Sequence, residues 1–192
     1  MNRRVGILAL QGDFSEHLAA FVQLDCDAVL VKRTAEVRGC DALVIPGGES
    51  TTIGKLCRRF GLDEAIVELS ERGAPIWGTC AGMILLAKEI EGSDQWRLGL
   101  MDITVRRNAF GRQVDSFEAD LTIEGVTGGP VRAVFIRAPF VTEVRADARV
   151  LARLDEKIVM VRQDNLLATA FHPELTDDTR IHEYFLNMID GK

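Results

Sequence analysis

Short apolar runs alternate with longer amphipathic stretches through the first half of the chain. The apolar runs suit strands buried on both faces, and the stretches between them repeat their apolar residues at helical spacing. Gly61 is expected to interrupt the longer helical stretch and Gly73 to end it. This alternation predicts a parallel sheet with helices on both sides. The expected strands are 4–12, 27–32, 41–48 and 74–78, and the expected helices are 13–25 and 51–73.

Beyond about Leu98 the strand candidates follow one another closely, with turns between them, so part of the sheet is expected to be antiparallel. The chain shows no internal repeat or linker, and residues 1–192 are therefore expected to form a single α/β domain. The later strand candidates are 100–107, 114–123, 131–140, 149–155, 157–163 and 166–174. A closing helix is expected at 177–189, with one apolar face formed by Ile181, Tyr184, Phe185, Met188 and Ile189.

Composition narrows the range of partners. A chain of 192 residues that is 47% hydrophobic can bury one substantial core. Its net charge of −6 and isoelectric point near 5.2 argue against nucleic-acid binding, which requires a basic face. No apolar run approaches the roughly 20 residues of a membrane span, and the N-terminus lacks the apolar core of an export signal. We therefore expect a cytoplasmic protein with reduced cysteines, no membrane and no nucleic acid.

The segment Gly78-Thr79-Cys80-Ala81-Gly82 stands where an apolar strand is expected to turn into a helix over 83–90. Flanking glycines permit the tight strand–turn–helix that exposes a nucleophile at the end of a sheet. The helix start also favours a thiolate and offers backbone N–H groups to an oxyanion. A lone cysteine is usually a small buried apolar residue, but this context favours a nucleophile at Cys80.

A thiolate nucleophile requires a base, and the chain has three histidines. His172 ends an expected strand, and Glu174 follows two residues later, where its carboxylate could orient the imidazole. His17 and His182 fall on expected helices and are interpreted as surface or capping residues. We therefore select His172 as the base.

A glycine pair directly follows the expected strand in Ile-Pro-Gly-Gly-Glu-Ser-Thr-Thr, residues 45–52. Such a turn can direct N–H groups at a developing oxyanion, while Ser50 and Thr51 could cap the next helix. The segment lacks the Gly-Lys-Ser/Thr ending of a Walker phosphate loop.

Together these motifs resemble the glutaminase subunits of pyridoxal 5'-phosphate synthase, which are class I (triad) glutamine amidotransferases. Gly-Thr-Cys-Ala-Gly and His-Pro-Glu indicate the superfamily, whereas the segments 106–121 and 134–139 narrow the resemblance to this subunit. The likeness runs from about Val5 to Met188. Two departures are slight: Ala109 where the family often has serine, and Phe140 where a polar residue is expected.

The resemblance implies a three-layer, flavodoxin-like fold with a mixed, mostly parallel sheet, and hydrolysis of L-glutamine to glutamate and ammonia. In it Cys80 forms a glutamyl thioester, His172 is general base and acid, and Glu174 orients His172. It implies no cofactor and no metal. Backbone N–H groups of Gly48 and Ala81 would form the oxyanion hole. The glutamine-binding positions would be Gly48, Glu49, Ser50, Arg107, Ile136 and Arg137.

Free ammonia is of little use as a product, and the expected domain leaves no residues to consume it, so a partner chain must accept it. The resemblance implies that this partner is the barrel-shaped synthase subunit, in a large hetero-oligomer that makes pyridoxal phosphate. Docking would involve the N-terminal strand and first helix, around residues 8–17.

Three alternatives stay open at this point. A glutaminase subunit of another pathway, such as histidine biosynthesis, would share most of the motifs. A stand-alone cysteine hydrolase, such as a peptidase or γ-glutamyl hydrolase, would need no partner and should lack the paired arginines. A non-enzymatic binding module is disfavoured by the intact Cys80, His172 and Glu174.

Overall fold

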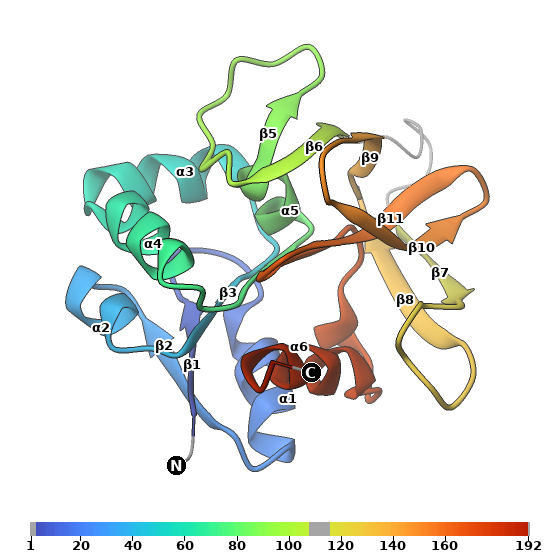
Figure 1. Cartoon of the computed structure of the whole chain (residues 1–192), viewed down its shortest axis with the longest axis horizontal. Coiled ribbons are helices and arrows are strands. Elements are labelled where there is room, and N and C mark those ends of the chain that lie inside the picture. The colour runs from blue at the N-terminus through green and yellow to red at the C-terminus, as the bar shows by residue number, and fades with distance from the viewer. Residues whose placement is uncertain (1–2, 108–115, 192) are drawn as a thin grey trace.

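The computed structural model describes residues 3–107 and 116–191 of the chain. A ten-stranded sheet runs through it in the order β2-β1-β3-β4-β12-β11-β9-β6-β5, with β10 added beside β11, and β7 and β8 form a separate two-stranded sheet (Figure 1). The strands are β1 (Arg4–Leu8), β2 (Asp27–Val31), β3 (Ala42–Ile45), β4 (Ile76–Thr79), β5 (Ala87–Ile90), β6 (Met101–Arg106), β7 (Ser116–Leu121), β8 (Val131–Ile136), β9 (Phe140–Val144), β10 (Arg149–Leu154), β11 (Lys157–Gln163) and β12 (Leu166–Thr169).

The parallel half of the sheet contains β2, β1, β3, β4 and β12, and the strands from β11 to β9 and β6 pair antiparallel. All four residues of β3, β4 and β12 are buried, as expected for central strands covered on both faces. The mixed, mostly parallel α/β architecture expected from the sequence is therefore confirmed.

Helices cover the two faces of the sheet. On one side α1 and α6 lie together (Figure 1), and Phe185 of α6 packs with its ring 5.4 Å from that of Trp77 in β4. The helices α2 and α3 both pack against α4, and α3 also contacts α5. The helices are α1 (Phe14–Gln23), α2 (Thr34–Arg38), α3 (Ser50–Arg59), α4 (Leu62–Glu71), α5 (Ala81–Leu86) and α6 (Arg180–Ile189), and Pro173–Leu175 form a 3₁₀ turn, η1.

The sequence analysis did not predict α2, and the segments 83–90 and 131–140 also differ from its predictions. The helix expected over 83–90 ends at Leu86, and β5 follows, because Ala87 turns extended and the chain pairs parallel with β6. Pairing within the sheet here outweighs local helical preference. The strand candidate 131–140 is two strands in two sheets, β8 and β9, separated where Arg137 adopts a positive φ of 44°.

Gly61 interrupts the long helical stretch as predicted. It has a φ of 65°, a left-handed conformation that glycine adopts without strain, and it separates α3 from α4. Among the described residues, no helix is both long and apolar enough to cross a membrane. Residues 108–115 of the family-like segment, Ala109 among them, lie outside the described residues.

Candidate active site

Cys80 occupies a strained turn between β4 and α5. Its φ of 48° and ψ of −100° are rare for a residue with a side chain, and its backbone N–H donates to Thr169 O at 2.8 Å. A Cβ on Gly78 would lie 2.4 Å from the carbonyl carbon of Gly82, and one on Gly82 would lie 2.1 Å from Ile45 O. Both glycines are therefore required for strand and helix to meet around the thiol, as the sequence predicted.

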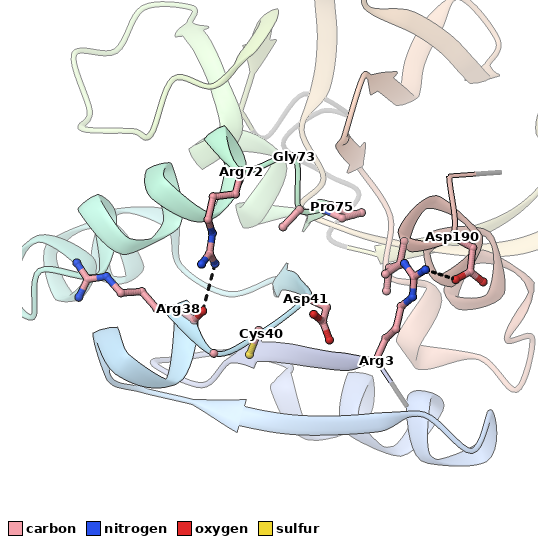
Figure 2. Close-up of a pocket in the computed structure, with 11 residues that line it drawn as sticks. Arg3, Arg38, Cys40, Asp41, Arg72, Gly73, Pro75 and Asp190 are labelled. Atoms are coloured by element: carbon pink, nitrogen blue, oxygen red, sulfur yellow. Dashed lines mark hydrogen bonds and ion pairs between the residues drawn. The ribbon is translucent and has the colours of Figure 1, made fainter. Parts of the chain in front are cut away.

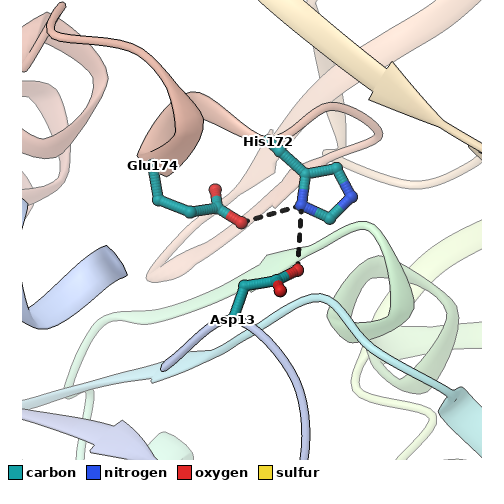
Figure 3. A group of neighbouring side chains, drawn as sticks. All are labelled: Asp13, His172 and Glu174. Carbon is teal, nitrogen blue, oxygen red and sulfur yellow. Dashed lines mark hydrogen bonds and ion pairs between the residues drawn. The ribbon is translucent and has the colours of Figure 1, made fainter. Parts of the chain in front are cut away.

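His172 and Glu174 lie directly after β12, the strand beside β4. His172 Nδ1 is 2.8 Å from Glu174 Oε1, and both side chains are almost completely buried (Figure 3). Burial lowers the pKa of His172, but hydrogen bonds to Cys80 and Glu174 outweigh it and raise the pKa to about 10. The ring is therefore held as an imidazolium between a thiol and a carboxylate, an arrangement suited to nucleophilic catalysis.

Asp13 approaches the same histidine from the loop before α1. Its Oδ2 lies 3.4 Å from His172 Nδ1 (Figure 3), and burial raises the pKa of its carboxyl group. Ligand atoms of Asp13, His172 and Glu174 lie within 4.8 Å of one another, close enough to share a cation. We assign no metal here, because a cation on Nδ1 would displace the 2.8 Å contact between His172 and Glu174.

The Gly47-Gly48 turn packs against both the base and the N-terminal loop. A Cβ on Gly47 would lie 2.4 Å from His172 Cε1, and Gly48 has a φ of 150°. Asp13 N donates to Gly47 O at 3.2 Å, and Glu49 N donates to Gln11 Oε1 at 2.7 Å. The loop after β1 therefore holds this turn by hydrogen bonds on both sides.

Two further predicted site residues join β8 to the cysteine. Cys80 Sγ lies 3.9 Å from Ile136 O, and the next residue is Arg137, with its left-handed backbone. Ala81 is the first residue of α5, where backbone N–H groups have no partner within the helix. Ile136 O and the start of α5 therefore lie beside the thiol at the end of β4.

Glu49, rather than Ser50 or Thr51, caps α3. Its carboxylate accepts from the backbone N–H groups of Thr51 and Thr52, which corrects the capping prediction. A carboxylate satisfies two N–H groups at once and complements the helix dipole, so it displaces the shorter hydroxyls from this role. Arg107 Nη2 lies 3.8 Å from Glu49 Oε1, so two of the predicted glutamine-binding side chains lie close together.

Gln95 connects these residues, although nothing in the sequence pattern singled it out. Its Oε1 accepts from Arg107 Nη1 at 2.7 Å, Ser50 Oγ at 3.2 Å and Thr51 Oγ1 at 3.3 Å. Its Nε2 is buried and makes no hydrogen bond within the described part of the chain. Gln95 thus holds Arg107 and Ser50 in place and keeps one free donor.

His17 and His182 are not surface or capping residues, as the sequence analysis had assigned them. Both are fully buried, and His17 Nε2 lies 3.3 Å from Glu174 Oε2. The earlier interpretation was wrong because α1 and α6 pack against each other over β4, so these histidines face inward. A helical position alone does not show which polar residue faces inward.

A separate pocket of about 1020 Å³ opens away from these residues. Arg3, Asp41 and Pro75, which stand just before β1, β3 and β4, line it, and its arginines contact Asp190 and the backbone of Arg38 (Figure 2). Ligands of open α/β sheets bind at the opposite, carboxyl ends of the strands, where Gly47 and Cys80 lie. We therefore place the active site at Cys80 rather than at this pocket.

Comparisons with known proteins show which family the chain is similar to. A family model described as the SNO glutamine amidotransferase family matches residues 7–191. The pyridoxal 5'-phosphate synthase subunit PdxT of Carboxydothermus hydrogenoformans is 56% identical over 97% of this chain and 97% of its own. PdxT of Pelotomaculum thermopropionicum is 60% identical over 95% of this chain and 93% of its own. A crystal structure of a glutamine amidotransferase superposes with a TM-score of 0.92 at 50% identity, covering 97% of this chain and 98% of the other.

Proposed function

The chain belongs to the SNO glutamine amidotransferase family, and on that premise we infer that it is the glutaminase subunit of pyridoxal 5'-phosphate synthase. It hydrolyses L-glutamine to L-glutamate and ammonia and supplies the ammonia to a synthase subunit. We take residues 1–192 as one glutaminase domain. The observation that carries the chemistry is the contact of His172 with both Cys80 and Glu174 at a strained turn.

The chemistry follows from the charges of these three residues. The Cys80 thiolate attacks the side-chain carbonyl carbon of glutamine, and the His172 imidazolium gives its proton to the leaving nitrogen, which departs as ammonia. The resulting thioester is attacked by water, which gives a proton to His172, and glutamate is released as the Cys80 thiolate and the His172 imidazolium are restored. Glu174 holds the ring in the orientation that both proton transfers need. The backbone N–H groups of Gly48 and Ala81 stabilise the oxyanion in each step.

The predicted binding positions supply groups that match the rest of glutamine. Arg107 and Arg137 suit the substrate carboxylate, because a guanidinium binds a carboxylate through paired hydrogen bonds. The Glu49 carboxylate suits the α-ammonium group. Ser50 and the backbone of Gly48 and Ile136 complete the proposed binding site.

The partner is proposed to be a barrel-shaped synthase subunit in a large hetero-oligomer. Docking over residues 8–17 fits the observation that the loop after β1 touches the glycine turn through Gln11 and Asp13. A shift of this loop on docking can therefore rotate the Gly47-Gly48 peptide, whose N–H is needed for the oxyanion. We place the subunit in the cytoplasm, because the reaction requires a reduced Cys80 thiol.

The test is glutamate release from glutamine by the purified chain, alone and with a synthase subunit of pyridoxal 5'-phosphate synthase. We expect weak hydrolysis alone and strong stimulation by the synthase subunit, since one missing oxyanion donor costs on the order of 10²–10³ in kcat. Cys80→Ala should abolish release while leaving binding to the synthase subunit intact. Wild-type rates in Cys80→Ala would refute the mechanism, and equal rates with and without the partner would refute activation by docking.

A further inference from the structure

A second buried pair of histidines contacts the catalytic carboxylate. His17 of α1 lies with Nδ1 3.1 Å from His182 Nε2 of α6, and with Nε2 3.2 Å from Thr79 Oγ1. The same Nε2 is 3.3 Å from Glu174 Oε2, and the side chains of His17 and Glu174 are fully inaccessible to solvent. The contact therefore lies entirely within the protein interior.

The protonation of this pair follows from what each neighbour can accept. Burial is the main cause that lowers the pKa of His17 well below its usual value, and the positive charge of His172 lowers it further, so His17 is neutral and has one N–H. A carboxylate only accepts hydrogen bonds, so the proton belongs on His17 Nε2, facing Glu174. His17 Nδ1 is then an acceptor, and His182 Nε2 must donate to it.

His182 ends this chain of hydrogen bonds. Burial lowers its pKa to about 4, so it is also neutral, and with a proton on Nε2 its Nδ1 carries none. That Nδ1 is buried and has no hydrogen-bond partner among residues 3–107 and 116–191. The direction of donation is thus His182 to His17 to Glu174, with no charge added to the interior.

Glu174 needs such a donor on its second oxygen. Its Oε1 faces His172, but its buried Oε2 makes no aligned hydrogen bond within the described residues, and the His17 Nε2 contact is long. Catalytic hydrogen bonds are often long in unliganded enzymes and shorten when substrate binds. The N–H at His17 Nε2 can also be shared between Thr79 Oγ1 and Glu174 Oε2, because both oxygens lie at nearly the same distance from Nε2.

We propose that His17 is a positioning residue for the glutaminase reaction, which donates its Nε2–H to Glu174 Oε2 and fixes the carboxylate against His172. This inference rests on the proposed function of Cys80, His172 and Glu174. Asp13 directly precedes α1 and His17 lies four residues later in its first turns, so the start of this segment presents an acid to His172 and a donor to Glu174. The first helix is therefore part of the catalytic support.

The test compares two nearly isosteric substitutions in the complex with the synthase subunit. His17→Gln keeps an N–H donor where Nε2 stands, whereas His17→Met fills similar space without a donor. We expect His17→Met to lower kcat about 10- to 100-fold with KM within about twofold of wild type. His17→Gln should return kcat to within about threefold of wild type. His17→Asn, which is too short to reach Glu174, should behave like His17→Met and replaces it if His17→Met does not fold.

The pH profile separates positioning from packing. A Glu174 carboxylate that is held less firmly against His172 stabilises the imidazolium less and lowers the pKa of His172. The alkaline limb of the kcat/KM profile should therefore move to lower pH in His17→Met and His17→Asn but not in His17→Gln. Ala20→Gly destabilises the same buried helix without touching Glu174, and we expect it to lower thermal stability while leaving kcat and the profile unchanged.

A readout without glutamine keeps this inference separate from the proposed function. Alkylation of Cys80 by iodoacetamide, followed against pH by mass spectrometry, reports the thiolate–imidazolium pair directly. A wild-type complex that releases no glutamate would overturn the proposed function, whereas the alkylation profiles would still test His17. Wild-type kcat and alkylation profiles in His17→Met or His17→Asn, or equal losses in His17→Gln, would overturn the positioning role.

Discussion

The substitution Gly47→Ala tests how closely the glycine turn packs on the proposed catalytic base. A Cβ on Gly47 lies 2.4 Å from His172 Cε1 and 3.0 Å from Nδ1, whereas ordinary contacts begin at 3.4 Å. Either the ring or the turn must therefore move by about 1 Å. Asp13 Oδ2, 3.2 Å from the same Cβ, limits movement of the turn on that side.

The clash displaces the His172 ring, which is the proposed catalytic base. His172 is held at 2.8 Å from Glu174 Oε1, and its ring has little free space because only 3% of the residue is exposed. A shift of 1 Å in a catalytic group can cost roughly 10²-fold in rate. We expect kcat for glutamate release by Gly47→Ala, with the synthase subunit present, to fall by about that factor, and KM to change less.

A matched control is available at Gly39. Its backbone φ is −85°, and a Cβ there meets its nearest neighbours at 3.5 Å, so Gly39→Ala adds the same methyl group without a clash. Thermal unfolding of both variants checks that the fold is intact. Wild-type kcat in Gly47→Ala would show that contact between turn and ring does not set the geometry of the base.

The remaining predictions concern substrate binding and pH. Arg107→Ala should raise the KM for glutamine about 10- to 100-fold and lower kcat less, since a hydrogen bond to a charged group contributes about 1.5–3 kcal/mol; an unchanged KM would place the substrate carboxylate elsewhere. Gln95→Leu should raise KM about threefold to tenfold, because Arg107 loses its 2.7 Å acceptor, and titration of initial rates against glutamine measures this. Activity should persist to alkaline pH and fall as the pH rises towards about 10, where the His172 imidazolium loses its proton; a loss of kcat/KM centred near pH 7 would contradict this. The pKa of buried His182 is lowered from 6.5 to about 4, so the unfolded chain binds a proton in this range that the folded chain does not. The free energy of unfolding should therefore decrease as the pH falls through that window, by up to about 1.4 kcal/mol per pH unit, and denaturant titrations should show a shallower decrease in His182→Phe.

The sequence predicted the features that depend on local pattern. Runs of Val, Leu and Ile indicated the central strands, and the glycines around Cys80 indicated a turn too tight for side chains. Both features can be read from a few neighbouring residues, because buried strands are rich in apolar residues and close backbone approach requires glycine. The same holds for Glu174, only two residues from the histidine it contacts.

The features that sequence reasoning missed depend on residues far apart in the chain. His17 and His182 are 165 positions apart in the chain, and they come into contact only because α1 and α6 meet over β4. Gln95 lies 45 residues from Ser50 in a segment without regular structure, so no periodicity points to it. The extended β5 likewise follows from pairing with β6, which local helical preference cannot reveal.

The N-terminal segment contacts both the glycine turn and the triad, so it can couple the two. Gln11 and Asp13 bind the backbone of the glycine turn, Asp13 also faces His172, and His17 faces Glu174. If the synthase subunit docks on this segment, as proposed, it would act on the proposed oxyanion hole and the triad through the contacts of Gln11, Asp13 and His17. Separate responses are expected from its two ends: changes at Gln11 should alter the stimulation by the synthase subunit, whereas changes at His17 should alter the pH profile. If substitutions at Gln11 and His17 gave the same response, the segment would act as a single rigid support, and docking would have no separate route to the glycine turn.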